Sequence, residues 1–107
     1  MSAELPGIGG LTDRIQLQRR ELSPEAEGGQ TEIFVPLWTL WARVTAIGAR
    51  EARSADGRSV VLSHTVVLRH RNDVRPGDRF VYRGRHLSVV SAEDMSGRKR
   101  FLGCRCV

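Results

Sequence analysis

The sequence has no long hydrophobic run and very little cysteine. None of its apolar stretches approaches the ~18 residues that a membrane-spanning helix requires. Only Cys104 and Cys106 could form disulfides, so no disulfide framework holds this fold. The stretch from Met1 to Pro6 has no basic start followed by an apolar segment, which predicts that there is no signal peptide. We therefore expect a protein made in the cytosol of the producing cell, with no membrane partner.

The sequence also lacks the residue groupings that catalysis and metal binding need. On one strand, His64 and His70 would lie ~20 Å apart, too far to share a metal ion. The Cα atoms of Cys104 and Cys106 would be ~6.6 Å apart on one strand face, near the upper limit for a disulfide. A zinc site would need two further ligands. We expect buried or half-buried free thiols, no cofactor and no enzymatic activity.

What the sequence does contain is typical of one small basic domain. It has 107 residues, of which 40% are hydrophobic and 27% charged, and its net charge is +5. Residues 1–68 carry a net charge of −1 and residues 69–107 a net charge of +6. All basic residues except Lys99 are arginine, which suits phosphate and carboxylate pairing. A genome rich in G and C would favour arginine too, so nucleic acid nearby is only one interpretation.

Alternation of apolar and polar residues predicts strands along most of the chain. Residues 12–22 alternate clearly, and a second stretch, 31–47, is rich in apolar and aromatic residues. Pro36 should break that stretch, leaving a long strand from about Thr39 to Ala46. A helix over 37–47 is the alternative, because Leu37, Leu40, Trp41 and Val44 also fit helical spacing.

Later segments complete the predicted fold. In residues 59–71, one face should point to the core, namely Val60, Leu62, His64, Val66, Leu68 and His70. Residues 79–83 and 86–92 predict a hairpin around Gly84, and residues 99–107 a final strand. Residues 1–10 should be a flexible lead-in, and 11–107 a single domain. The fold class is all-β: a small antiparallel barrel or sandwich of about six strands.

Gly48 to Arg58 is the one segment without a large apolar residue. Because it cannot anchor itself in a core, we expect a mobile loop or a short exposed helix around Ala49–Ser54.

The order of several short motifs resembles the phage head-tail joining family, also called head-completion or stopper proteins. The first strand contains Arg14-Ile15-Gln16-Leu17-Gln18, and Trp41-Ala42-Arg43-Val44 is followed by Gly48-Ala49-Arg50-Glu51. The next strand reads from His64 to Arg71, and the last part contains Pro76-Gly77-Asp78-Arg79, Tyr82-Arg83-Gly84-Arg85 and Val89-Val90. The resemblance covers about residues 11–107.

The resemblance implies a structural virion protein. Such proteins form rings, here a six-fold homo-oligomer, between the portal-bound adaptor and the tail terminator or tail tube. They retain packaged double-stranded DNA in the channel and provide the surface on which the tail docks. By position, residues 48–59 correspond to the channel loop, so Arg50, Arg53 and Arg58 become candidates for contact with DNA. The particle could belong to a phage, a prophage remnant or a gene transfer agent.

Apolar and aromatic residues of the middle strands are candidate core or interface anchors. They are Trp38, Trp41, Val44, Val66 and Leu68, and Trp41 should be buried near the three aliphatic ones. The alternative is that the tryptophans stack on nucleic acid bases. The chain would then be a small basic β-barrel that binds nucleic acid directly.

Overall fold

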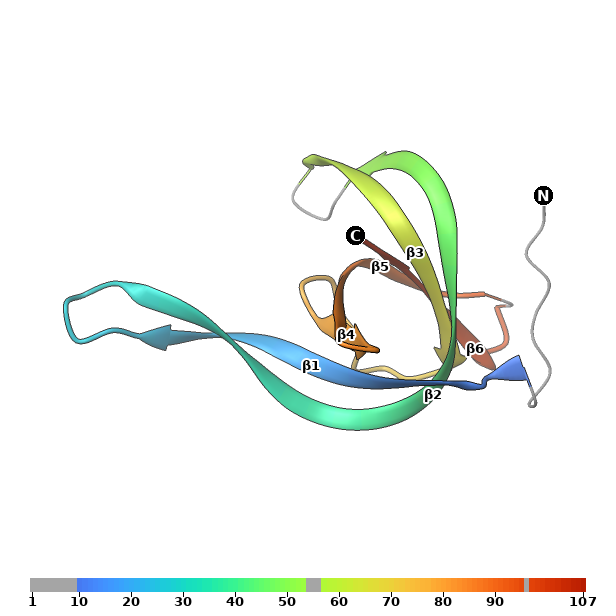
Figure 1. Cartoon of the computed structure of the whole chain (residues 1–107), viewed down its shortest axis with the longest axis horizontal. Coiled ribbons are helices and arrows are strands. Elements are labelled where there is room, and N and C mark those ends of the chain that lie inside the picture. The colour runs from blue at the N-terminus through green and yellow to red at the C-terminus, as the bar shows by residue number, and fades with distance from the viewer. Residues whose placement is uncertain (1–9, 54–56, 96) are drawn as a thin grey trace.

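Six antiparallel strands form a closed barrel in this computed structural model, which describes residues 10–53, 57–95 and 97–107. Around the barrel the strands follow the order β1-β2-β3-β6-β5-β4 (Figure 1). This confirms the predicted all-β fold. No helix in the described residues is long and apolar enough to cross a membrane. The strands are β1 (Asp13–Pro24), β2 (Gln30–Arg53), β3 (Ser59–Arg69), β4 (Arg79–Tyr82), β5 (Arg85–Asp94) and β6 (Phe101–Cys106).

Strand β2 is one continuous strand of 24 residues, so the helix alternative for residues 37–47 is wrong. Pro36 does not end the strand. Gln18 pairs with Pro36 and Leu17 with Trp38, which makes Leu37 the extra residue of a β-bulge. Proline has no N–H for a ladder, and a bulge is a position where this is tolerated. The expected break near Pro36 is therefore a local shift of register.

Ala42 is the residue at which β2 changes partners. Residues 30–42 of β2 pair with β1, and residues 42–53 pair with β3. Ala42 alone pairs on both sides, with Asp13 and with Leu68, and its side chain is completely buried. The β1–β2 and β2–β3 ladders therefore meet at this small residue.

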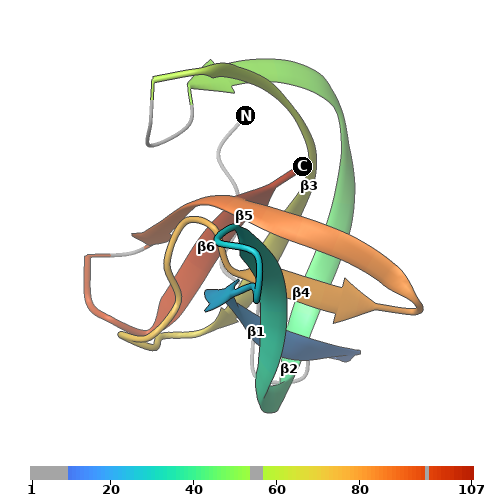
Figure 2. The same ribbon diagram turned by 90° about the vertical axis from the view of Figure 1, so that its left-hand side faces the viewer.

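Two hairpins project beyond the barrel because their strands continue past the last neighbouring strand. Arm 1, residues 19–24 and 30–35, extends beyond Gln18, the last residue of β1 that pairs with β4 (Figure 1). Arm 2, residues 46–53 and 59–63, extends beyond His64, where the pairing of β3 with β6 ends. Figure 1 shows arm 1 reaching out to one side, and in Figure 2 the same arm points toward the viewer while arm 2 curves over the barrel.

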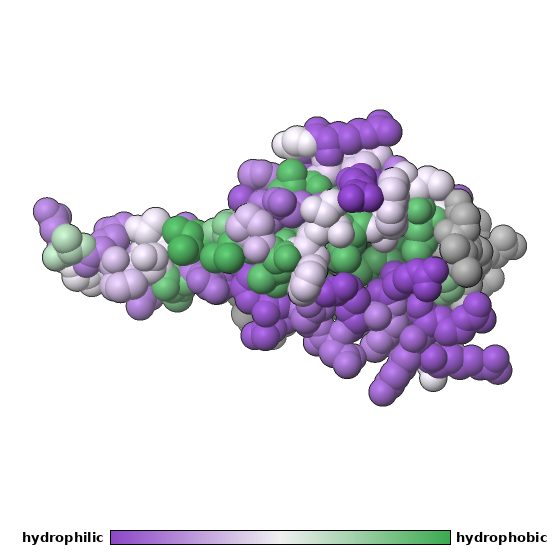
Figure 3. All heavy atoms as spheres, turned by 90° about the horizontal axis from the view of Figure 1, so that it is seen from below, coloured by the Kyte–Doolittle hydropathy of each residue, from purple (hydrophilic) through white to green (hydrophobic). Residues whose placement is uncertain are grey.

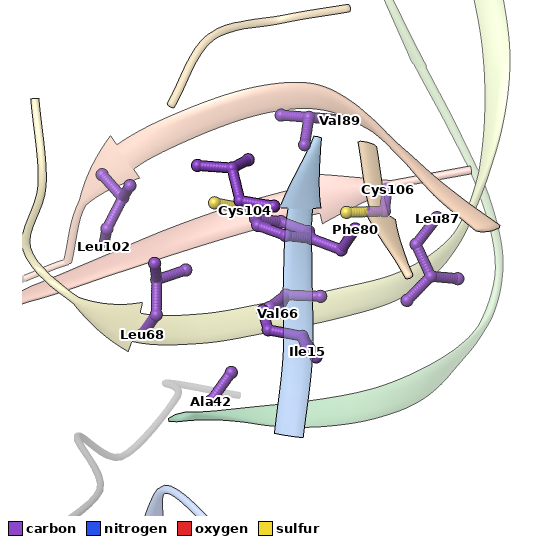
Figure 4. Close-up of a cluster of buried hydrophobic side chains, with 11 residues drawn as sticks. Ile15, Ala42, Val66, Leu68, Phe80, Leu87, Val89, Leu102, Cys104 and Cys106 are labelled. Carbon is purple, nitrogen blue, oxygen red and sulfur yellow. The ribbon is translucent and has the colours of Figure 1, made fainter. Parts of the chain in front are cut away.

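The core lies inside the barrel and receives side chains from all six strands (Figure 4). Leu62, His64, Val66 and Leu68 of β3 are buried, which confirms the inward face predicted for that strand. A second cluster, formed by Leu11, Val67 and Phe101, packs outside the barrel. The main cluster contains Ile15, Leu17, Ala42, Val66, Leu68, Phe80, Leu87, Val89, Leu102, Cys104 and Cys106.

The β4–β5 hairpin turns at Arg83 and Gly84, whose φ angles are 49° and 78°. Two consecutive positive φ values are typical of the type I′ turn, which matches the twist of the strands that it joins. The hairpin predicted around Gly84 is confirmed.

Ala42→Leu should destabilise the protein by about 1–3 kcal/mol, because a larger side chain must be forced into a filled core where two ladders meet. Denaturant unfolding would measure this. The control is Ala46→Leu, since Ala46 lies on the same strand but is exposed. Equal stability of the two variants would contradict the close packing at the point where β2 changes partners.

Cys104 and Cys106 are buried free thiols, and burial raises the pKa of both, that of Cys106 to about 12. In the unfolded chain a thiol ionises near pH ~8.5. Because the unfolded state loses these protons first, stability should be complete below about pH 8.5 and fall as the pH rises towards 12. Unfolding measured across this range tests the prediction. Rapid reaction of the folded protein with a thiol reagent near pH 8 would refute the burial of the thiols.

Candidate functional site

An ion pair between the partly buried Arg19 and the buried Asp78 joins the base of arm 1 to the barrel. The guanidinium of Arg19 donates from Nε to Oδ1 of Asp78 at 3.2 Å and from Nη2 to Oδ2 at 3.1 Å. It also donates to the backbone carbonyl of Asp73. The Arg75 backbone N–H donates to Asp78 at 3.0 Å, so this carboxylate has several partners. The hydrogen bond to Asp78 raises the pKa of Arg19.

A second arginine, Arg79 at the start of β4, contacts the same region of arm 1. Arg79 stacks on the ring of Phe34, with its guanidinium carbon 3.7 Å from the ring centroid. Its Nε donates to the side-chain oxygen of Gln18 at 2.6 Å. Arm 1 therefore leaves the barrel in a direction fixed by two guanidinium groups. No local sequence pattern indicates the Arg19–Asp78 pair, because its members are 59 residues apart.

Beyond its base, arm 1 combines exposed aliphatic side chains with carboxylates. Leu22 is 55% exposed and lies across the ladder from Glu32, whereas Ile33 is 42% exposed and lies across from Glu21. Directly opposed residues share a face of the sheet, so each face of arm 1 carries one such pair. Arg20 forms an ion pair with Glu32 at 3.1 Å, but no ion pair to Glu21 occurs within the described residues.

Trp38 and Trp41 are 56% and 54% exposed, so the expectation that Trp41 is buried is wrong. Trp41 precedes the buried Ala42, and adjacent residues of a strand point to opposite faces. The guanidinium carbon of Arg14 lies 4.6 Å from the centroid of the Trp41 ring, and that of Arg71 lies 5.4 Å from the Trp38 ring. Both contacts are cation–π interactions.

The other three anchor candidates do lie inward. Val66 and Leu68 are 0% and 1% exposed, and Val44 is partly buried against the same core. The residues predicted as one group are thus divided between the core and the surface.

A groove of about 500 Å³ opens beside Trp41, and we call it the aromatic groove. Arg71 lines it and is held by two hydrogen bonds of 2.9 Å to Asp73, which lower the pKa of that carboxyl group. Neither Arg14 nor Arg69 has an ion-pair partner in the part of the chain that the structure describes. The lining residues are Leu11, Thr39, Leu40, Trp41, Leu68, Arg69, His70 and Arg71.

Hydrophobic and charged groups alternate over this side of the molecule. Figure 3 shows hydrophobic side chains continuing from arm 1 onto the barrel, bordered by strongly hydrophilic ones. A surface of this kind offers apolar area together with charge, which suits binding to another macromolecule.

Arm 2 replaces the loop or helix expected between Gly48 and Arg58. Arg50 pairs with Leu62 and Arg53 with Ser59, so these residues form a β-ladder. Between Ala46 and Arg50 the register shifts, which places a bulge in the arm. Residues 54–56 lie outside the described part. The structure brings Arg50, Arg53 and Arg58 to the end of one arm, where all three are exposed.

A polar contact joins the base of arm 2 to the hairpin of β4 and β5. Nη1 of Arg85 lies 3.3 Å from Nε2 of His64, and Oγ of Ser63 lies 2.8 Å from Nδ1. Because a guanidinium can only donate, Nε2 accepts and the proton of a neutral imidazole is on Nδ1, which donates to Ser63. No group of three or more His, Cys, Asp or Glu in the described residues could hold a metal ion.

Comparison with known proteins identifies the family. The model of the phage head completion protein family matches residues 7–107, and the chain belongs to that family. It is therefore a structural virion protein, as the sequence motifs indicated. No curated protein matches the chain.

Two solved structures share the fold. One is a chain described as "Virion of native gene transfer agent (GTA) particle", with a TM-score of 0.67 and 21% identity, covering 90% of this chain and 92% of that one. The other is the solution structure of protein SF1141 from Shigella flexneri 2a, with a TM-score of 0.69 and 22% identity, covering 94% of this chain and 95% of that one.

Asp78→Ala should destabilise the protein by about 3 kcal/mol, because it leaves the Arg19 charge without its partner at a site where the two side chains are only 19% and 4% exposed. Glu32→Ala is the matched control, since its pair with Arg20 is half exposed and contributes about 0.5 kcal/mol. Thermal or denaturant unfolding of both variants tests this. A similar small loss in both would show that the base of arm 1 does not depend on the buried pair.

Proposed function

We propose that the chain forms a ring at the head-tail interface of a phage-type particle, between the portal or adaptor and the tail. The observation that carries this proposal is membership of the head completion family over residues 7–107, in a barrel with two projecting arms. The ring surrounds the channel for packaged double-stranded DNA and provides a docking surface for the tail. The chain acts by binding and catalyses no reaction.

The distribution of charge supports a ring of identical subunits. Arm 1 and its turn carry four glutamates and two arginines, a net charge of −2, whereas residues 69–107 have a net charge of +6. An acidic surface on one copy can therefore meet a basic surface on the next. A head-to-tail contact of this kind closes into a ring when its rotation does.

Arm 2 is the candidate for contact with DNA. Arg50, Arg53 and Arg58 are exposed at the end of a hairpin whose tip contains no large apolar side chain. Each exposed charge pair contributes only ~0–1 kcal/mol, but repetition around a ring multiplies the charge facing the channel. The collar formed in this way would hold DNA through its phosphates, independently of base sequence.

Replacing Arg50, Arg53 and Arg58 together with glutamine should leave the subunit folded and the particles assembled, with less DNA retained. The matched control replaces Arg43, Arg75 and Arg83 with glutamine. These arginines are also exposed, so the control removes the same amount of positive charge. The measurement is the DNA content of purified particles after storage, together with infectivity or gene transfer. Full DNA retention by the arm 2 variant would contradict a role of this arm in the channel.

Direct binding of nucleic acid by the exposed tryptophans is a second candidate function, with Trp41 in the aromatic groove and Trp38 outside its lining. It is favoured by one observation: both tryptophans are more than half exposed and lie beside arginines. Stacking of a base on an aromatic side chain contributes ~1–3 kcal/mol. Micromolar binding of single-stranded DNA by the isolated chain would favour this function over the ring.

Trp41→Ala should lower stability by about 1 kcal/mol, the scale of an exposed cation–π contact with a little packing. Denaturant unfolding measures this, and Trp38→Ala is a matched comparison because its exposure is nearly the same. A loss of ~3 kcal/mol or more would indicate a core residue. Titration of Trp41→Ala with single-stranded DNA separates the two functions. The ring predicts that the variant has the same DNA affinity as the parent, whereas direct binding by the tryptophan predicts a lower affinity.

A further inference from the structure

Arm 1 and the aromatic groove have complementary surfaces. One face of arm 1 carries Ile33 beside Glu21, an exposed aliphatic side chain next to a carboxylate with no ion-pair partner among the described residues. The groove carries the exposed ring of Trp41 beside Arg14 and Arg69, two guanidinium groups that likewise form no ion pair in that part of the chain. Each surface therefore offers apolar contact, with the Glu21 carboxylate on the arm and the guanidinium groups of Arg14 and Arg69 at the groove.

These two surfaces cannot meet within one subunit. Ile33 and Trp41 lie on the same strand, β2, and eight residues of strand separate them by about 27 Å. The buried Arg19–Asp78 pair fixes the direction in which arm 1 leaves the barrel, and Figure 1 shows the arm extending away from it. A partner for the groove that has the chemistry of arm 1 must therefore be another copy.

We propose that arm 1 of one copy docks in the aromatic groove of a second copy, with Ile33 against Trp41 and Glu21 paired with Arg69. This inference rests on the proposed ring and names its contact between subunits. Because arm and groove are different surfaces, each copy both offers an arm and receives one. The contact is heterologous, which a ring requires and a two-fold dimer does not use.

Charge favours a second copy over nucleic acid as the occupant. Nucleic acid in the groove would use the arginines but would leave Glu21 and Ile33 of arm 1 in solvent. Docking of the arm pairs the carboxylate and removes apolar surface of both partners from water, so both surfaces are used. Arm and groove are also present in equal number in any assembly of this chain.

A cysteine pair in purified particles tests the contact. Ile33→Cys and Thr39→Cys in one chain place thiols on the arm and on the groove, while Cys104 and Cys106 are buried and should not react. A short bismaleimide should then join copies into dimers and higher multimers. The control pair, Ile33→Cys with Arg83→Cys, should not, because Arg83 lines a separate hollow beside His64.

Charge reversal on the same background provides a second readout. Glu21→Arg alone and Arg69→Glu alone should each lower the crosslinked fraction about tenfold, the scale of a close charge pair at an interface. The double reversal should restore it. Unchanged crosslinking in the single variants, or no recovery in the double variant, would overturn the pairing, since a fold defect would not be rescued by a second reversal.

Immunodetection of the chain in the same particles separates this inference from the proposed function. A chain that is present but crosslinks to a different virion protein, or not at all, overturns the contact between arm and groove and leaves the ring component in place. If single-stranded DNA protects the introduced thiols from the bismaleimide and no multimers form, the contact between arm and groove is overturned in favour of nucleic acid. Absence of the chain from particles contradicts both.

Discussion

The barrel depends on a single strand that belongs to two ladders. Strand β2 pairs with β1 along its first half and with β3 along its second, and only Ala42 pairs with both. A side chain at this point must fit between two hairpins that leave the barrel in different directions, and alanine is completely buried there. Because each half of β2 has a neighbour on one side only, closure of the barrel at Ala42 also creates two hairpins with free edges. The arms are the parts of these hairpins that continue past the pairing of β1 with β4 and of β3 with β6. Exposed charges on both arms discourage uncontrolled pairing of these edges.

The two arms differ in how firmly they are held. At the base of arm 1, a buried bidentate ion pair joins Arg19 to Asp78, and the same carboxylate accepts a backbone N–H. At the base of arm 2, the contact is a 3.3 Å hydrogen bond between Arg85 and the His64 ring, and a bulge follows in β2. A bidentate contact between opposite charges is stronger than a single hydrogen bond from a guanidinium to an imidazole. Arm 1 is therefore held more firmly than arm 2, which supports the proposed roles of arm 1 in the subunit contact and of arm 2 at the channel.

The sequence predicted most strands correctly, but it did not predict which aromatic residues are exposed or how far the hairpins extend. Alternation located β1, β3 and the β4–β5 hairpin, because each has a face that packs in the core. It failed for Trp41, because β2 has apolar residues on both faces and Trp41 lies on the face opposite the buried Ala42. It failed for residues 48–53 for a different reason. A ladder is held by backbone hydrogen bonds, so a hairpin can extend into solvent without the large apolar side chains that served as the signal for a strand. The Arg19–Asp78 pair joins distant segments and had no local pattern.

The position of the two tryptophans is the strongest physical argument for a binding surface. The chain has only six aromatic residues other than histidine, and aromatic side chains give the largest gain when they are buried. Phe80 and Phe101 are used in this way, whereas both tryptophans remain more than half exposed, each beneath an arginine. This arrangement adds little to the stability of one subunit. It does match the composition of interface centres, where tryptophan and arginine contribute most of the binding free energy. The exposed tryptophans therefore support the proposal that this surface is covered by a binding partner in the assembled particle.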